Sequence, residues 1–344
     1  MVCENILVPY KPAILKQMVA YSFYLFTLFL QTSCIIPKKD KLVKQFFYTI
    51  ILLPLSLLSF DYHLKPVQIG SSSAYCFFGL PEVMNKKNNG NMSNSCFVNM
   101  GNSYLVIDSG PTYQYAKQAY EQMKKIADLK IKYVINTHVH DDHWLGNGYY
   151  KSLGVKIIGS SAFKTLEIEA MTRMKRRISP EAYEKTRQVH PELFVDEEMV
   201  LYLDHKRVIL KNIGAKAHTD SDMTIYISSK RIVFAGDLVF NDRLPSIRDG
   251  NLKSWLEALD EILLLDVDYI VGGHGTIVTR KSVEMTYEYL KTLRDEVLRL
   301  MDEGEEIGDV VNAVTMDKFK NINLYDSMHR QNVETAYRML EWEE

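Results

Sequence analysis

Residues 137–147 read Thr-His-Val-His-Asp-Asp-His-Trp-Leu-Gly-Asn and follow the apolar run Tyr133-Val134-Ile135. This stretch holds three of the nine histidines of the chain, together with two carboxylates. A β-branched run that ends in a polar loop is typical of a buried strand whose carboxyl end carries the chemistry. Imidazole and carboxylate groups are ligands that a borderline-soft ion such as zinc accepts, so their density predicts a metal site here.

The spacing within this stretch divides the candidate ligands into two sets. Alternate residues His138 and His140 can face one cation, while Asp142 and His143, turned the other way by the loop, can face a second. The other interpretation is a solvated polar turn. That interpretation gives no reason for three histidines and an aspartate to cluster, and we therefore favour the metal site.

Three further motifs downstream each carry one candidate ligand. Each motif adjoins an apolar, strand-like run and contains glycine, as loops between strands and helices often require. They are His218 in Gly-Ala-Lys-Ala-His-Thr (214–219), Asp237 in Phe-Ala-Gly-Asp-Leu (234–238) and His274 in Gly-Gly-His-Gly (272–275).

The motif His-x-His-x-Asp-His and the order of the three later ligands resemble the signature of the metallo-β-lactamase superfamily, from about Leu64 to the C-terminus. The resemblance implies an α/β fold, the four-layer αββα sandwich, whereas periodicity alone supports only mixed α/β structure. It also implies a complete set of metal ligands. The first site would hold His138, His140 and His218, the second Asp142, His143 and His274, and Asp237 would bridge them.

This ligand set implies a dinuclear hydrolase with two Zn²⁺ ions, iron and manganese being the alternatives. Two close cations lower the pKa of a shared water, so that a metal-bound hydroxide can attack a carbonyl-type substrate, namely a thioester, ester or lactam. Asp142 would orient this hydroxide and is the candidate catalytic residue. The sequence offers no Gly-x-Ser-x-Gly motif that would supply a serine nucleophile instead.

Within the superfamily, residues 234–245 and the following Trp255 most resemble the exported quinoprotein relay system zinc metallohydrolases. A non-catalytic metal-binding accessory protein of a periplasmic sulfur or quinoprotein pathway is the alternative. An intact Asp142 argues against that alternative, because a purely structural metal site is normally closed and has no use for a residue that orients water.

Composition bounds the partners of the protein. The chain has 344 residues, 41 basic and 43 acidic side chains and a formal net charge of −2, which excludes a generally basic nucleic-acid-binding protein. We expect a small-molecule substrate and no nucleic acid, and the oligomeric state stays open. All four cysteines (Cys3, Cys34, Cys76 and Cys96) precede the metal motifs, so no thiolate is available downstream as a ligand.

The N-terminal part holds two apolar runs, 18–30 and 46–60, separated by lysines at 38, 39, 41 and 44. The second run has the form of a secretory signal, with a basic region, an apolar core and a polar turn. This run lacks a small-x-small cleavage site, so an uncleaved anchor is the other interpretation of it. For the residues before the lysines, a start codon placed too early is a further interpretation. We expect 1–60 to be a signal or anchor region and 61–344 the hydrolase domain. The domain would then be periplasmic, with membrane contact only through the N-terminal segment.

Periodicity predicts the remaining elements. Strands are expected at 74–78, 96–100, 104–107, 132–136, 155–159, 199–203, 207–210, 223–227, 231–235 and 268–271, and helices at 111–128, within 161–189, at 252–264 and 281–301, and around His329. If the chain is exported, pairing of the first strands can bring Cys76 and Cys96 together as a disulfide, and two buried thiols are the equal alternative.

Several other side chains have a structural and a functional interpretation. Asp108 matches a family position that supports the metal loops, or it forms a turn. The basic run of Arg173, Lys175, Arg176 and Arg177 is a solvated face, or it borders the site and attracts an anionic substrate. Trp144 has two interpretations, core packing or a place in the lining of the substrate pocket. Core packing is expected for Trp255. The candidates for substrate contacts in the loop after Asp237 are Asn241, Arg243 and Arg248.

Overall fold

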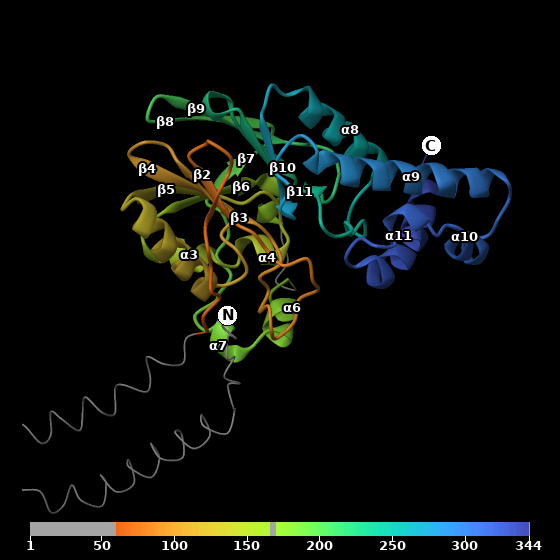
Figure 1. Cartoon of the computed structure of the whole chain (residues 1–344), viewed down its shortest axis with the longest axis horizontal. Coiled ribbons are helices and arrows are strands. Elements are labelled where there is room, and N and C mark those ends of the chain that lie inside the picture. Colours follow the sequence, from red (N-terminus) through yellow and green to blue (C-terminus); the bar gives the residue numbers. More distant parts are fainter. Residues whose placement is uncertain (1–59, 166–169, 344) are drawn as a thin grey trace, which may run out of the picture. The chain divides into compact units, whose positions relative to one another are not determined.

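Two β-sheets stack in the structure, and helices cover their outer faces (Figure 1). This computed structural model describes residues 60–165 and 170–343. The expected signal or anchor region, and therefore the domain boundary after residue 60, depends on residues outside this range and stays a prediction. Among the residues described, no helix combines the length and the apolar character needed to cross a membrane.

The first sheet has seven strands in sequential order. Its first four strands pair antiparallel, and from β4 onward the pairing is parallel. The strands are β1 (Val67–Gln68), β2 (Ala74–Phe77), β3 (Ser95–Asn99), β4 (Ser103–Ile107), β5 (Lys130–Ile135), β6 (Lys156–Ser160) and β7 (Leu193–Val195). Because parallel strands present their carboxyl ends at one edge, the residues that follow β4, β5 and β6 gather there.

The second sheet has five strands in the order β12, β11, β10, β9, β8. Only β11 and β12 pair in parallel, and the others form antiparallel hairpins. The strands are β8 (Glu198–Leu203), β9 (Lys206–Asn212), β10 (Met223–Ile227), β11 (Ile232–Phe240) and β12 (Tyr269–His274). All nine residues of β11 are buried, and its register with β12 shifts after Phe234 and again after Gly236.

Side chains that alternate along the strands divide between separate cores. In β3 and β4, Cys96, Val98 and Leu105 enter the core between the two sheets, whereas Phe97 and Val106 enter the core beneath the first helices. The first helices are α3 (Tyr113–Ile126), α4 (Asp141–Trp144), α5 (Asn147–Ser152), α6 (Ala170–Arg177) and α7 (Pro180–Tyr183). The Thr112 side chain caps the N-terminus of α3 by accepting a hydrogen bond from the backbone N–H of Tyr115.

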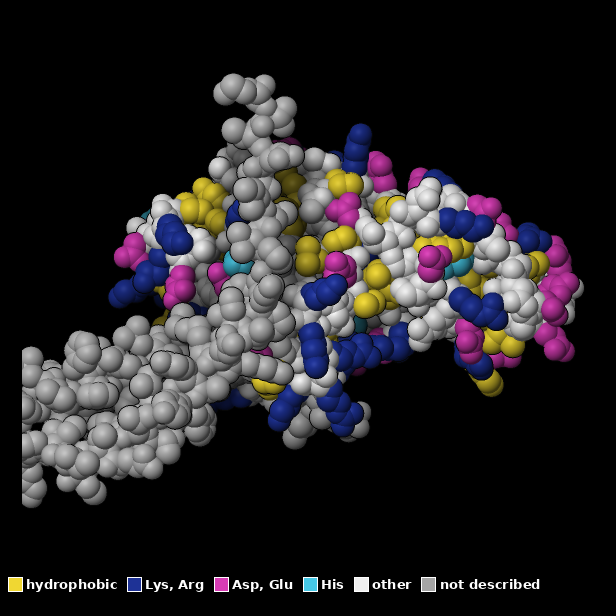
Figure 2. Space-filling view, turned by 60° about the horizontal axis from the view of Figure 1, so that its bottom comes forward, with side chains coloured by type: hydrophobic (Ala, Val, Ile, Leu, Met, Phe, Trp, Pro, Cys, Tyr) yellow, Lys and Arg dark blue, Asp and Glu magenta, His cyan; other side chains and the backbone are white. Residues whose placement is uncertain are grey.

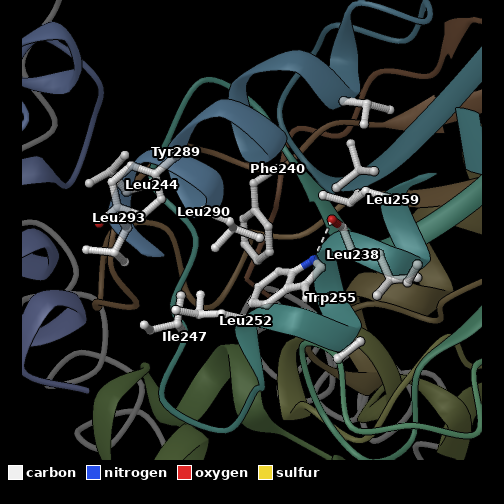
Figure 3. Close-up of a cluster of buried hydrophobic side chains, with 14 of the residues drawn as sticks. Leu238, Phe240, Leu244, Ile247, Leu252, Trp255, Leu259, Tyr289, Leu290 and Leu293 are labelled. Carbon is white, nitrogen blue, oxygen red and sulfur yellow. Dashed lines mark hydrogen bonds between the residues drawn. The ribbon is translucent and has the colours of Figure 1, made fainter. Parts of the chain in front are cut away.

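A third core joins the second sheet to the remaining helices, which are α8 (Leu252–Leu264), α9 (Ser282–Asp302), α10 (Ile307–Ala313) and α11 (Tyr325–Leu340). Figure 3 shows Phe240 of β11 beside Trp255 of α8 and Leu290 of α9 in this core. The Trp255 indole N–H donates to the carbonyl of Leu238 over 2.9 Å. The expected core role of Trp255 is therefore confirmed, and this packing fixes the strand that carries Asp237.

Most predicted elements are present, and the bounds of β10 and α8 agree with the prediction at both ends. The prediction for 231–235 was too short, because β11 continues to Phe240. In the expected helical region 161–189, the described residues form only short helices, and the three-residue strand β7 was missed. Cys76 and Cys96 face each other on β2 and β3 and form a disulfide, which decides between the two interpretations left open by the sequence.

Candidate metal centre

Seven side chains from five parts of the chain meet at one edge of the two sheets. His138 and His140 lie in the loop after β5, and Asp142 and His143 lie on α4. The others are His218 between β9 and β10, Asp237 in β11 and His274 at the end of β12. The ligand atoms of His138, His140, His218 and Asp237 all lie within 4.8 Å of one another, as do those of Asp142, His143 and His274.

The carboxylate of Asp237 lies between these two groups. Its Oδ2 is 3.6 Å from His138 Nε2 and 3.3 Å from His218 Nε2. The same carboxylate reaches the other group, with Oδ1 3.1 Å from His143 Nε2 and Oδ2 3.2 Å from His274 Nε2. Proximity alone assigns Asp237 to the first group, but these contacts show that it belongs equally to both.

Three of the converging atoms are buried without a hydrogen-bond partner, namely His138 Nε2, His143 Nε2 and Asp237 Oδ1. A buried polar atom that lacks a partner costs free energy, so such atoms call for an unseen partner. Nitrogen lone pairs and a carboxylate oxygen that point at one another are satisfied together by a cation. The residues therefore fit the divalent metal that the sequence predicts.

The opposite ring nitrogens of four histidines are held by acceptors. His143 Nδ1 lies 2.7 Å from Asp108 Oδ2, and His274 Nδ1 lies 2.8 Å from the carbonyl of Met92. His140 Nε2 is 3.2 Å from Asp249 Oδ2, and His138 Nδ1 is 3.1 Å from the hydroxyl of Thr137. A proton held on the outer nitrogen leaves a lone pair on the inner one, which is the tautomer that binds a metal.

Asp108 connects several parts of this arrangement. Besides His143, its carboxylate accepts hydrogen bonds from the backbone N–H and the hydroxyl of Thr137, each over 2.8 Å. The Thr137 hydroxyl donates to Asp108, so its oxygen remains free to accept from His138. One buried carboxylate thus orients a histidine of each group, which is the supporting role that the family resemblance implied.

His218 is oriented by aromatic packing instead. Its ring centroid lies 4.9 Å from Trp255 and 5.5 Å from Phe240, and Phe240 in turn stacks on His274 at 4.9 Å with an interplanar angle of 8°. Its Nδ1 is buried and has no hydrogen-bond partner. The hydrophobic core shown in Figure 3 therefore sets the position of this ligand directly.

Burial sets the protonation states that metal binding needs. Burial lowers the pKa of His218 to about 4 and, together with the neighbouring imidazoles, holds the pKa of His138 well below its usual value. For Asp237, burial raises the pKa, but the surrounding histidines outweigh it and the pKa falls well below the usual range. His138 and His218 are thus neutral, and Asp237 ionised, at neutral pH, as metal coordination requires.

His143 behaves differently while no cation is bound. Burial lowers its pKa, but the carboxylates of Asp237, Asp108 and Asp142 more than offset this effect and hold the pKa well above its usual value. A proton therefore takes the place of the cation at His143, and a bound metal must displace it.

Helix α6 packs against α4 and brings a basic side chain close to the second group. Arg173 forms an ion pair with the buried Asp141, and its Nη2 lies 3.9 Å from Asp142 Oδ1. Lys175, Arg176 and Arg177 on the same helix are exposed. Figure 2 shows basic side chains gathered on the face where α6 lies. The basic run thus includes one residue that adjoins the site and three that face solvent.

Other candidates are placed away from a direct role. Trp144 is fully buried, donates from its indole to the carbonyl of Val139 and packs against Phe163, so it belongs to the core and does not wall a pocket. Asn241 is also buried. Its side-chain amide donates to the backbone carbonyl of Ile277 and accepts from the backbone N–H of the same residue, so it holds a loop in place.

Two partners of the metal ligands were missed by sequence reasoning. Asp249 lies two residues before the cap of α8, where an aspartate is ordinary in a turn, and only the folded chain places it at His140. Met92 acts through its backbone carbonyl, so its side chain carries no signal. Arg248, a candidate for substrate contacts from its sequence position, forms an ion pair with Asp249 over 2.6 Å. It is therefore connected through Asp249 to His140.

Comparisons with known proteins show the family to which the chain belongs. Residues 88–274, more than half of the chain, match the family model described as the metallo-β-lactamase superfamily. The chain belongs to this superfamily. Its fold is mixed α/β, with two sheets and helices, and its histidine and aspartate clusters are able to bind metal ions.

Two solved structures show the same fold. One is a metallo-β-lactamase from Pontibacter korlensis, with a TM-score of 0.52 and 16% identity, for which the match covers 66% of this chain and 99% of that chain. The other is a double mutant of the sec-alkyl sulfatase PisA1, with a TM-score of 0.63 and 16% identity, covering 81% of this chain and 51% of that chain. At this identity the likeness concerns the fold alone.

We expect Asp108→Asn to weaken the second metal site. The amide places an N–H group opposite His143 Nδ1, which removes the acceptor that holds the outer proton, so affinity for the second metal should fall about 10- to 100-fold. Metal content per chain and competition with a chelator measure the effect.

Asp222→Asn is the matched control, because Asp222 is another buried carboxylate that accepts from the backbone and hydroxyl of a threonine, Thr219, but has no hydrogen bond to a histidine. Equal metal affinity in Asp108→Asn and the wild type would contradict the role given to Asp108.

Proposed function

We propose that this protein is a dinuclear metal-dependent hydrolase that cleaves a carbonyl-type substrate, namely a thioester, ester or lactam. The observation that carries the proposal is the position of Asp237, whose carboxylate lies within 3.6 Å of imidazole nitrogens from both groups. A shared anion reduces the repulsion between two nearby cations. Two Zn²⁺ ions suit the five imidazoles and two carboxylates, with iron or manganese as the alternatives.

Two bound divalent cations would supply an activated water and polarise the substrate carbonyl. The chain supplies the placement of the reacting groups. Asp142 is buried in the second group, and its Oδ2 lies 3.8 Å from both His143 Nε2 and His274 Nε2. Burial raises the pKa of Asp142, but these two histidines outweigh it, so the carboxylate stays ionised and can hold the proton of the attacking water.

Two serines beside the candidate ligands are engaged elsewhere, which favours water over either of them as the nucleophile. The hydroxyl of Ser93 donates to the backbone carbonyl of Asp142, and the hydroxyl of Ser221 accepts from the backbone N–H of Val139. Both side chains thus hold the loops that carry the ligands. Neither forms the hydroxyl-to-base hydrogen bond that a serine nucleophile needs.

The sequence motif bears on the subgroup, and the similar structures bear on the choice of substrates to be tested. The motif at residues 234–245 resembles the quinoprotein relay system zinc metallohydrolases, and we propose this group for the chain. One similar structure is named a metallo-β-lactamase and the other a sec-alkyl sulfatase, which are descriptions of those proteins. A sulfate ester therefore belongs among the substrates to be tested beside the three carbonyl classes.

The test is metal analysis combined with a panel of chromogenic ester, thioester, lactam and sulfate ester substrates. We expect two metals per chain and turnover of a carbonyl substrate by the wild type. Asp237→Ala should lose the second metal and nearly all activity while the fold, followed by circular dichroism, survives. Unchanged metal content in that variant would contradict the bridging role. Two metals without turnover of any substrate would favour the accessory protein, and turnover of the sulfate ester alone would replace the carbonyl substrate.

Asp142→Asn should separate metal binding from the chemical step. The amide keeps the shape of the side chain but cannot hold a proton, so we expect much of the first metal to remain while kcat falls about 100-fold or more. Steady-state kinetics on the substrate identified by the panel, with metal content measured on the same sample, checks this expectation. A kcat equal to that of the wild type would remove Asp142 from the mechanism.

We also propose that the hydrolase domain works outside the cytoplasm. The lysine cluster followed by the apolar run 46–60 motivates this proposal, and the Cys76–Cys96 disulfide supports it, because disulfides persist in oxidising compartments and are rare in the cytosol. Fusion of residues 1–65 to a reporter that is active only after export should give a signal. A fusion that lacks residues 1–60 should give none, and equal signals from the two fusions would contradict export.

A further inference from the structure

Arg243 is the second residue after Asn241 in the loop that leaves β11, and it is only 7% exposed. A guanidinium stays charged at neutral pH, even where burial lowers its pKa as it does here. An arginine in such a place ordinarily has a carboxylate beside it, because an unpaired buried charge is costly. The partners of Arg243 therefore decide what it is for.

The guanidinium has no anionic partner in the part of the chain that the structure describes. Its Nε donates weakly to the carbonyl of Leu244 over 3.4 Å, and Nη2 lies 3.9 Å from the sulfur of Met328. Its Nη1 is buried and has no hydrogen-bond partner. A full positive charge is thus held only by long contacts with neutral groups, and Nη1 of the guanidinium stays without a hydrogen-bond partner.

The position of this charge is beside the metal centre. The guanidinium carbon lies 5.8 Å from the centre of the Phe240 ring, and that ring packs against both His274 and His218. Asp237 and Asp142 are close enough for their charges to act on Arg243, although neither forms an ion pair with it. Both carboxylates are already committed to the imidazoles that surround them.

Residues far along the chain fix the loop in this place. The backbone N–H of Leu244 donates to the carbonyl of Asn323 over 3.0 Å, and the Asn323 amide donates to the carbonyl of Asp242 over 2.6 Å. Met328 of α11 contacts the guanidinium itself. The C-terminal segment thus keeps the guanidinium of Arg243 buried close to the candidate metal centre. Movement of this side chain into solvent would remove the free-energy cost of burying its charge.

We propose that Arg243 is a specificity-determining residue that selects substrates with an anionic group, such as a carboxylate, near the bond that is cleaved. An anionic group of the substrate then serves as the counter-ion of the Arg243 guanidinium, which the described residues of the chain do not provide. This inference rests on the proposed hydrolase function, since it names the class of substrate for the same site. Its physical basis is that a site built around a desolvated, unpaired charge discriminates strongly against a ligand that lacks the matching group.

The other arginines near the site do not fill this role. Arg173 is neutralised by Asp141, and Arg248 is neutralised by Asp249. Both of them are also more exposed than Arg243, so solvent screens their charges. An anionic substrate would have to compete with a carboxylate at either of these positions.

The experiment compares two esters with the same 4-nitrophenyl leaving group, the neutral acetate and the anionic monoester of glutaric acid, on the metal-loaded full chain. Calorimetric titration with glutarate measures recognition of the anion without turnover. Arg243→Met removes the charge and keeps the length of the side chain, and Arg243→Lys keeps the charge. Arg294→Met is the matched control, because Arg294 also has a buried unpartnered nitrogen, Nε, but is neutralised by Glu343.

We expect Arg243→Met to lose about 30-fold or more in kcat/KM for the anionic ester and in affinity for glutarate, and less than about threefold for the neutral ester. Its thermal midpoint without ligand should equal or exceed that of the wild type, because an unpaired buried charge has been removed. Arg243→Lys should keep part of the preference, and Arg294→Met should keep all of it.

Equal losses on both esters, or unchanged glutarate affinity in Arg243→Met, would overturn the proposal. If the wild type cleaves neither ester, the proposed ester cleavage fails, and the glutarate titration still decides the role of Arg243. If Arg243→Met does not fold, the comparison of Arg243→Lys with the wild type on the two esters decides instead. A wild type that has the same kcat/KM for the neutral and the anionic ester counts against the proposal.

Discussion

The arrangement at this site depends on one buried carboxylate, that of Asp237, and on the strand that presents it. Four imidazole nitrogens lie between 3.1 and 3.6 Å from its oxygens. Such crowding needs bare backbone on both sides. Gly236 adopts a φ of +52°, where a side chain would also collide with Thr137, and a Cβ at Gly273 would collide with the Asp237 carboxylate. The register between β11 and β12 shifts on both sides of Gly236, and the aromatic core around Trp255 packs against the same strand.

Much of the fold was predictable because its signals are local. Alternation of apolar residues predicted β10, and the amphipathic period predicted α8, in each case with the observed bounds. The candidate ligands stood out because their motifs adjoin apolar, strand-like runs, and those of His218, Asp237 and His274 also contain glycine. The missed features are those that depend on distant residues. Strand β7 has three residues and pairs only with β6, while Gly236 and Asp237 resemble a loop although the strand continues through them.

The surroundings of the ligands were less predictable than the ligands, for a physical reason. An acceptor for the outer nitrogen of a histidine can be any oxygen, so Asp108 serves His143, a hydroxyl serves His138 and the backbone of Met92 serves His274. The family match ends at residue 274, yet Asn323 and Met328, beyond it, contact the loop that carries Arg243. The candidate ligands therefore all lie within the family match, whereas these contacts come from the part of the chain that follows it.

The distribution of charge separates the rim of the site from its interior. Two divalent cations would carry more positive charge than Asp142 and Asp237 can balance, so the occupied centre by itself attracts anions. At the rim, Asp141 and Asp249 neutralise Arg173 and Arg248, which limits long-range attraction of any passing anion. Among the described residues, Arg243 has no ion-pair partner in the low-dielectric interior, where a charge acts most strongly on what lies closest. In the proposed role of Arg243, discrimination between substrates would take place beside the reacting bond, where it affects the transition state as well as binding.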